Sequence, residues 1–170
     1  MNKLKAPGKW LFAFVLCLNF FTYSIAFAAD TEKPEAVAKV VFHADYDDAQ
    51  RMSSMLTSIF NMVTTYENQF VEYDIRIVFL SHGIQFLTHD RLKKTPFEVN
   101  DKQAKLRENL ITRLTTLHDM QNINLSLCEI TRQAIGLDKS KLIPGVTLVP
   151  SGVVEIAKLQ SEGFSYLKVQ

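Results

Sequence analysis

The sequence lacks the glycine-rich motifs that nucleotide-binding proteins use. Its six glycines form no Gly-x-Gly-x-x-Gly pattern, and no Gly-Lys pair is followed by serine or threonine. Such motifs place backbone N–H groups around the phosphates of dinucleotides and nucleoside triphosphates. The sequence therefore gives no support to dinucleotide-dependent chemistry or to the hydrolysis of nucleoside triphosphates.

An excess of charge of either sign is also missing. The chain has 19 lysines and arginines against 18 aspartates and glutamates, a formal net charge of +1. Nucleic-acid-binding domains usually carry a clear excess of basic residues on one face. We therefore expect no nucleic-acid partner.

The start of the chain has the pattern of a secretory signal peptide. Three lysines within the first nine residues precede an almost uncharged run, residues 10–27. Ala26-Phe27-Ala28 fits the small-x-small motif that precedes a cleavage site. We therefore expect cleavage after Ala28.

This interpretation divides the chain into a signal peptide (residues 1–28), a flexible linker (29–37) and one domain (38–170) in the periplasm. Without its basic leader the domain is slightly acidic, and it is long enough to bury one sizeable core. The alternative is an uncleaved membrane anchor, because the apolar run is long enough to span a bilayer. After cleavage we expect no contact with the membrane.

Processing gives a first testable prediction. Protein recovered from the periplasm should begin at Ala29 when its N-terminus is sequenced, because the cleavage motif ends at Ala28. A full-length product retained in the membrane would contradict the export of this domain.

The chain has few cysteines, and cleavage of the expected signal peptide would remove one of them. The chain has two cysteines, and Cys17 lies in the leader. Cys128 is then the only cysteine of a protein in an oxidising compartment, so it has no internal disulfide partner. A single cysteine there suggests a reactive thiol or an intermolecular bridge. The alternative is a small buried packing residue.

Apolar strands and helical periods alternate along the domain. Five short apolar segments are expected as strands: 39–44, 75–80, 123–127, 145–150 and 164–169. Helices are expected between them at 47–67, 84–89, 98–120, 129–136 and 151–163. Alternation of this kind indicates a parallel sheet that is covered on both faces. We expect a three-layer α/β/α fold with a doubly wound, mostly parallel five-stranded sheet, similar to flavodoxin and Rossmann folds.

The helical segments carry apolar faces and end signals. The first face comprises Met52, Leu56, Ile59, Phe60 and Val63, and the stripe of the long helix comprises Leu106, Leu110, Leu114 and Leu117. Asn100 with Gln103 has the spacing of a capping box, and Ser151 is the expected N-cap of the last helix. Met55, Met62 and Tyr66 widen the first apolar face, and we expect this surplus to lie in a homo-oligomer interface.

The carboxyl ends of the expected strands collect the residues that can carry chemistry. In open α/β sheets, ligands bind beyond these ends. The residues there are His43, Ser81, His82, Gly83, Cys128, Ser151 and Gly152. We expect Cys128 and His82 to be catalytic and the other five to contact the substrate.

Cys128 is expected at the N-terminus of a helix, where the helix dipole favours a thiolate. Glu129 opposes this if its side chain turns toward the sulfur. His82 can donate to a bound anion, or it can be a hydrogen-bonded turn residue. His43, His82 and Cys128 could together ligate zinc, but no short ligand spacing supports such a site. No metal and no cofactor is therefore expected.

Four segments carry a family resemblance. They are, in order, KVVFHADYDDAQRMSSMLTSIFNMV, IRIVFLSHGIQFL, LSLCEIT and GVTLVPSGVVEIAKLQSEGFSYLKV. The chain resembles the DsrE/DsrF-like sulfur-relay family over nearly all of the expected domain, and in particular its small exported members. The resemblance implies a doubly wound fold and homo-oligomers, often trimers or hexamers. It also implies that Cys128 carries persulfide sulfur, and His82-Gly83 matches the usual pair after strand two.

Three functions remain open from the sequence. The first is a periplasmic sulfur-handling protein that accepts sulfane sulfur on Cys128 from a small sulfur compound or a donor protein. Such a protein would be a sulfurtransferase-like sulfur carrier. The second is a non-catalytic, homo-oligomeric module that binds a small ligand or a protein on the same rim. The third is a zinc-dependent hydrolase. Persulfide formation separates the first from the second, and metal content separates the third.

Overall fold

The computed structural model describes residues 37–170. The predicted signal peptide and nearly all of the linker lie outside these residues. The elements are, in order, β1 (Ala38–Ala44), α1 (Ala49–Asn68), β2 (Tyr73–Phe79), η1 (Ser81–Leu87), α2 (Asp101–Gln121), β3 (Asn124–Cys128), α3 (Glu129–Ala134), η2 (Lys139–Lys141), β4 (Val146–Val149), α4 (Gly152–Ser161) and β5 (Ser165–Leu167).

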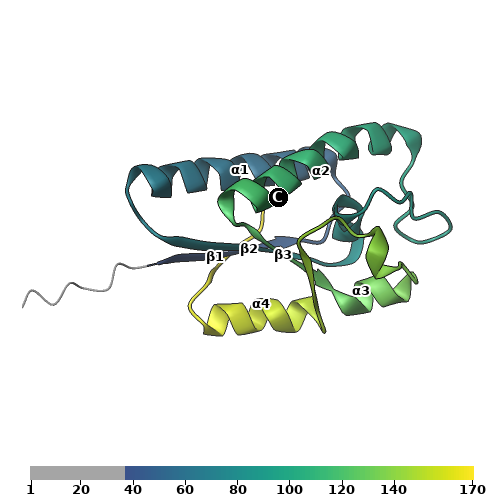
Figure 1. Ribbon diagram of the computed structural model, residues 1–170. Helices are drawn as coiled ribbons and strands as arrows, with labels where there is room; N and C mark the ends of the chain where they lie inside the picture. The colour runs from purple at the N-terminus through teal and green to yellow at the C-terminus, as the bar shows by residue number, and fades with distance from the viewer. Residues whose placement is uncertain (1–36) are drawn as a thin grey trace, which may run out of the picture. The chain divides into compact units, whose positions relative to one another are not determined.

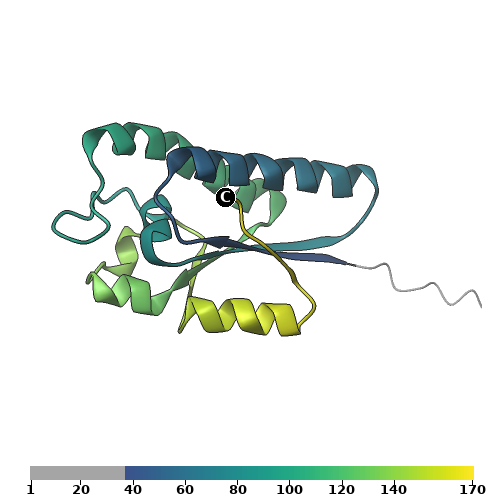
Figure 2. The same cartoon turned by 180° about the vertical axis from the view of Figure 1, so that it is seen from behind.

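The five strands form one parallel sheet with the order β4-β3-β2-β1-β5. Helices α1 and α2 cover one face of this sheet, and α3 and α4 cover the other (Figures 1 and 2). Parallel strands between two helical layers are buried on both faces, which explains the apolar runs of β1, β2 and β3, whereas the edge strand β5 is exposed. The predicted three-layer fold is confirmed.

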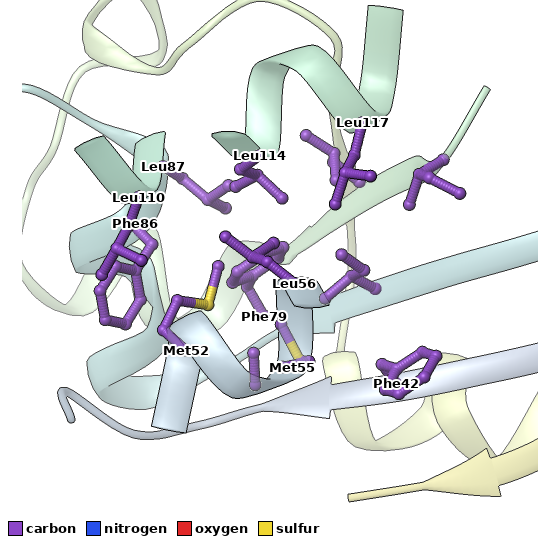
Figure 3. Close-up of a cluster of buried hydrophobic side chains, with 14 of the residues drawn as sticks. Phe42, Met52, Met55, Leu56, Phe79, Phe86, Leu87, Leu110, Leu114 and Leu117 are labelled. Atoms are coloured by element: carbon purple, nitrogen blue, oxygen red, sulfur yellow. The ribbon is translucent and has the colours of Figure 1, made fainter. Parts of the chain in front are cut away.

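The main core lies between the sheet and the α1–α2 layer. Phe42 of β1 and Phe79 of β2 point into it and are almost completely buried (Figure 3). Opposite them lie side chains from both helices: Met52, Met55, Leu56, Leu110, Leu114 and Leu117. A smaller cluster lies under α4 on the other face and comprises Val41, Val78, Ile156, Leu159 and Phe164.

Helix ends follow the predicted signals. The side chain of Asn100 accepts a hydrogen bond from the Gln103 N–H, and the Gln103 side chain accepts one from the Asn100 N–H in return. This reciprocal pair satisfies two donors that a helix start otherwise leaves free. Ser151 caps α4, and Gly163 follows that helix with a positive φ of 91°.

Two predicted core residues are wrong. Phe60 and Leu106 are each 52% exposed. Phe60 lies at one edge of the buried arc of α1, and Met55, which the sequence analysis placed in a surplus face, is buried at the other edge. In α2 the neighbouring Arg107, which is 2% exposed, points inward instead of Leu106. Its guanidinium donates to the carbonyl oxygens of His89 and Asp90.

Two smaller differences concern the segment after β2 and the proposed surplus face. A 3₁₀ helix, η1, replaces the α-helix expected at residues 84–89 and begins three residues earlier. Met55 is fully buried, and the ring of Tyr66 stacks on that of Tyr73 with centroids 6.2 Å apart. Part of the expected surplus face therefore packs within a single chain. Among the described helices, none has the length and apolar character needed to cross a membrane.

Candidate functional site

The chain leaves β2 and β3 toward opposite faces of the sheet. After β2, Ile84, Phe86 and Leu87 of η1 enter the core under α1 and α2, whereas α3 follows β3 on the other face (Figure 1). Adjacent parallel strands whose connections diverge in this way create a crevice at their carboxyl ends. Ser81 lies on one side of this crevice and Cys128 on the other.

Cys128 is the last residue of β3 and the N-cap of α3. Only 5% of it is exposed, so its side chain is buried. Burial raises the pKa of the Cys128 thiol, but hydrogen bonds from the N–H groups of Gly152, Thr131 and Ile130 and from the Thr131 hydroxyl lower that pKa below its ordinary value. The sulfur therefore lies among donors that favour the thiolate.

Gly152 brings the N-terminus of α4 to this sulfur. A β-carbon at position 152 would lie 2.6 Å from Cγ of Leu80, so any larger residue would force the Leu80 side chain to move. Glycine therefore allows the backbone N–H to approach the crevice. The neighbouring Ser151 uses its hydroxyl to cap α4 by accepting from the Val154 N–H at 3.5 Å. The backbone N–H of Gly152 thus helps to lower the pKa of the Cys128 thiol, while Ser151 stabilises the helix.

Thr131 was missed by the sequence analysis. Its hydroxyl accepts a hydrogen bond of 3.1 Å from the Ser81 N–H, so its own proton is free to be donated to Cys128. Ser81 has a φ of 48°, a left-handed conformation that costs a non-glycine residue about 1–2 kcal/mol. Thr131 is the third residue after the N-cap, a position from which a side chain can reach back to it. That spacing in the sequence could have indicated Thr131 as a partner of Cys128.

Glu129 does not direct its charge at the sulfur. Its carboxylate accepts two hydrogen bonds from Arg132, at 2.7 and 2.6 Å, and one from Gln133. The hydrogen bond from Arg132 lowers the pKa of Glu129 to about 2. The carboxylate is held along α3 by these partners, so the predicted opposition to a Cys128 thiolate is weakened.

His82 lies in the crevice but makes other contacts. Its Nδ1 lies 3.2 Å from the Ser81 hydroxyl, and its ring meets the edge of Phe97 with centroids 4.9 Å apart. No hydrogen bond in the described part of the chain joins His82 to Cys128. The next residue, Gly83, is buried. A β-carbon there would overlap the carbonyl oxygen of Ala44, so only glycine fits at this position. Its role is close packing of η1 against β1.

His43 belongs to a different group of residues. It pairs in register with Val78, which pairs with Ser126, so it lies two strands and about 10 Å from β3. Its Nδ1 is 2.9 Å from the Tyr166 hydroxyl, and its Nε2 is 3.6 Å from Asp45. Burial is the main cause that lowers the pKa of His43. His43 thus lies apart from Cys128, and its contact with the same substrate stays a prediction.

The three residues considered for zinc are not gathered in one place. Across residues 37–170, no cluster of three histidine, cysteine, aspartate or glutamate side chains has metal-binding geometry. His82 and Cys128 border the same crevice, but His43 is held by Tyr166. The arrangement at Cys128 consists of hydrogen-bond donors, which suits an anionic sulfur.

Two solved structures resemble this chain, and the first of them supports the fold. A solved structure of a protein of unknown function, MTH1491 from Methanobacterium thermoautotrophicum, is similar, with 27% identity and a TM-score of 0.58 over 77% of this chain and 98% of that chain. The ychN protein from E. coli has 21% identity and a TM-score of 0.47, over 78% and 99%. No curated protein matches this chain.

The sequence also matches a family model. The match covers residues 21–169, and with them every strand and helix described above. It includes the segment after β2, the end of β3 and the start of α4, which together surround Cys128. The chain belongs to the DsrE/DsrF-like family.

Proposed function

We propose that this protein carries sulfane sulfur as a persulfide on Cys128. The observation that supports the proposal best is the set of donors around the sulfur, from Gly152, Thr131 and Ile130. They favour a thiolate, which is the reacting form of cysteine. The DsrE/DsrF-like family is generally related to sulfur relay, which makes sulfur the first chemistry to test.

The proposed loading step balances as a displacement on sulfur. The Cys128 thiolate attacks the terminal sulfur of an inorganic polysulfide and forms a new S–S bond. The bond between that sulfur and its neighbour breaks, and the shortened polysulfide leaves with the electron pair. Cys128 is oxidised to a persulfide, and the polysulfide chain is reduced. An acceptor thiolate then attacks the outer sulfur and returns Cys128 as the leaving thiolate.

The surrounding residues have separate roles in this proposal. The donors of Gly152 and Thr131 lower the pKa of the Cys128 thiol and so favour negative charge on the sulfur. His82 acts through Ser81, because its ring lies beside the Ser81 hydroxyl and no hydrogen bond among the described residues joins it to the thiol. His82→Ala should therefore slow sulfur uptake without preventing it.

Thr131 gives a prediction about the thiol itself. Thr131→Val keeps the shape of the side chain but removes the hydroxyl that donates to Cys128, so the thiol pKa should rise. A hydrogen bond to a charged group contributes about 1.5–3 kcal/mol, so sulfur uptake at neutral pH should slow by about tenfold. The pKa can be measured from the ultraviolet absorbance of the thiolate during a pH titration. Thr131→Ser is the matched control and should keep the low pKa. Equal pKa values in all three proteins would contradict the role of the hydroxyl.

A second function is favoured by one observation, the 5% exposure of Cys128. A thiol that is this buried can be a packing residue, and the crevice would then serve a non-catalytic module that binds a small ligand or a protein. The two functions differ in one result, because only the first requires sulfur to become covalently attached to Cys128.

The proposed compartment is the periplasm. The proposal rests on the basic start, the apolar run and the Ala26-Phe27-Ala28 motif, which lie outside the described residues. Cys128 is then the only thiol, so any sulfur that the exported protein takes up must be on it. The sulfur donor and the acceptor would be small sulfur compounds or thiol proteins of that compartment.

A further inference from the structure

The stretches of α1 and α2 that lie against each other carry a single charged side chain. From Met52 to Tyr66, α1 contains no Asp, Glu, Lys or Arg, and in α2 Arg113 is the only such residue between positions 109 and 117. The two helices lie side by side on one face of the sheet (Figures 1 and 2). The positive charge of Arg113 therefore has no opposite charge in either of these stretches.

The guanidinium of Arg113 has donors without a partner. It donates to the Ser53 hydroxyl at 2.7 Å, to the Ser53 carbonyl oxygen at 3.2 Å and to the Thr57 hydroxyl at 3.0 Å. A guanidinium has five N–H donors, and these bonds use three of them. Among residues 37–170, the ion pairs of arginine do not include Arg113. A partly buried cation with neutral acceptors alone favours an anion as its partner.

An apolar hollow adjoins this guanidinium. Phe60 and Met120 at its edge are 52% and 77% exposed, so apolar surface is open to a ligand there. The hollow has a volume of about 350 Å³, and its lining includes Leu56, Phe60, Arg113, Thr116, Leu117 and Met120. Small-molecule sites have volumes of about 300 Å³ or more and combine an apolar lining with a few polar groups. The hollow has both properties.

Arg113 also borders a second hollow, of about 410 Å³, that lies nearer the start of α2. The lining of this second hollow includes Lys105, and neither lining contains an acidic residue. The two hollows together are named the α1–α2 groove. Its positive charge lies at Arg113 and toward Lys105, and its apolar surface lies at the other end, around Phe60 and Met120.

We propose that the α1–α2 groove binds a small amphipathic carboxylate, with the carboxylate on Arg113 and a hydrocarbon chain along Phe60, Leu117 and Met120. The planar guanidinium presents paired donors that match the two oxygens of a carboxylate. Gln121, at the far end of the lining, follows Arg113 by eight residues, which is about 12 Å along a helix. A chain of about eight carbons, with bonds of about 1.5 Å and a hydrogen bond of about 3 Å at its head, has this length.

The charge of the groove selects this ligand over others. An amine with the same hydrocarbon chain would bring a second cation to Arg113, and like charges repel. A nucleic acid needs many basic groups along its phosphates, and the groove has two. The proposal is separate from the sulfur chemistry, because the groove lies on the α1–α2 side of the sheet, whereas the donors to Cys128 come from α3 and α4.

A nuclear magnetic resonance titration of the full chain, as its host processes it, tests the proposal with sodium octanoate as the probe. The backbone amide signals of Thr57, Arg113 and Leu117 should shift and reach saturation. The dissociation constant should be about 1 mM or lower, as for a ligand of this size in a preformed site. Octylamine has the same chain with the opposite charge, and it should produce no saturable shift over the same range of concentration.

Two variants test the role of the guanidinium. Arg113→Gln should weaken octanoate binding about tenfold or more, because it removes a charged pair of donors. Arg113 also links α1 to α2, so a second variant keeps its bonds to Ser53. Thr116→Glu places a carboxylate three residues along the same helix, where it pairs with the guanidinium and repels octanoate, and it should cause a similar loss. Lys158→Gln removes an exposed positive charge from α4 and is the matched control, with unchanged affinity.

Each result either supports the proposal or overturns it. Saturable shifts at these amides, weakened in both variants and kept in Lys158→Gln, would support a carboxylate site at Arg113. The absence of saturable shifts in the wild-type protein would overturn it. Equal affinity for octylamine, or unchanged affinity in both variants, would show that the groove does not recognise the anion. Shifts gathered around Gly152 would assign the binding to the Cys128 crevice instead.

Discussion

Cys128→Ser should abolish sulfur uptake while leaving the fold unchanged. Serine is nearly the size of cysteine, and its oxygen can accept the same hydrogen bonds from Gly152 and Ile130. The hydroxyl is not ionised at neutral pH, however, so it cannot displace sulfur from a polysulfide. The amount of sulfane sulfur bound after polysulfide treatment and desalting, assayed by cyanolysis, should fall from about one per chain to background.

Two controls make this result specific. Far-ultraviolet circular dichroism and the thermal midpoint should be close to those of the wild-type protein. Only 5% of residue 128 is exposed, but serine is small enough to fit the packed site that cysteine occupies. Ile130→Ala changes an exposed side chain beside the thiol and should keep full uptake. If Cys128→Ser still bound sulfur, the sulfur would have to be held without a covalent bond, and the persulfide proposal would fail.

Gly83→Ala should cause the largest loss of stability of any conservative change near the crevice. The new methyl group would overlap the carbonyl oxygen of Ala44. That oxygen cannot simply move, because it accepts a 3.0 Å hydrogen bond from the Leu80 N–H and ends strand β1. Overpacking of this kind costs about 1–3 kcal/mol when side chains can adjust, and backbone is less adaptable. We expect the free energy of unfolding to fall by about 3 kcal/mol or more.

Gly136→Ala is the comparison for this substitution. Gly136 has a positive φ of 62° and nothing within 4 Å of an added β-carbon, so alanine there meets strain but no clash. Its cost should be about 1–2 kcal/mol. Urea denaturation of both variants gives the two values. Equal losses would show that η1 can shift away from β1, and that the close packing at Gly83 is not rigid.

Much of the fold could be predicted from the sequence because the signals are local. Continuous apolar runs predicted all five strands, and the Asn100–Gln103 spacing predicted the start of α2. The width of a buried arc is not local. Phe60 lies four residues after Leu56 and shares its side of the helix, yet it is 52% exposed, because tertiary packing decides how much of an apolar face is covered.

The candidate site could be predicted only in part. The rule that ligands bind at the carboxyl ends of strands placed Cys128, Gly152 and Ser81 on one rim, and the structure brings these three together. It also placed His43 there, because strand order is not visible in a single sequence. With β2 between β1 and β3, His43 points to Tyr166 instead.

The burial of Cys128 and the donors around it could not be predicted from the sequence, for a related reason. Its burial and its donors depend on how α4 packs against Leu80, and on Thr131 accepting from Ser81 across the crevice. These contacts join segments that lie far apart in the chain. Periodicity and motif spacing carry no information about them.

Intact mass of the wild-type protein after exposure to inorganic polysulfide tests the central proposal most directly. We predict a gain of one or more sulfur atoms, located by peptide mapping on Cys128 and removed by a thiol reductant. The gain should grow with pH as the thiolate forms. An unchanged mass, in folded protein whose Cys128 also resists alkylation, would contradict the proposal and identify Cys128 as a packing residue.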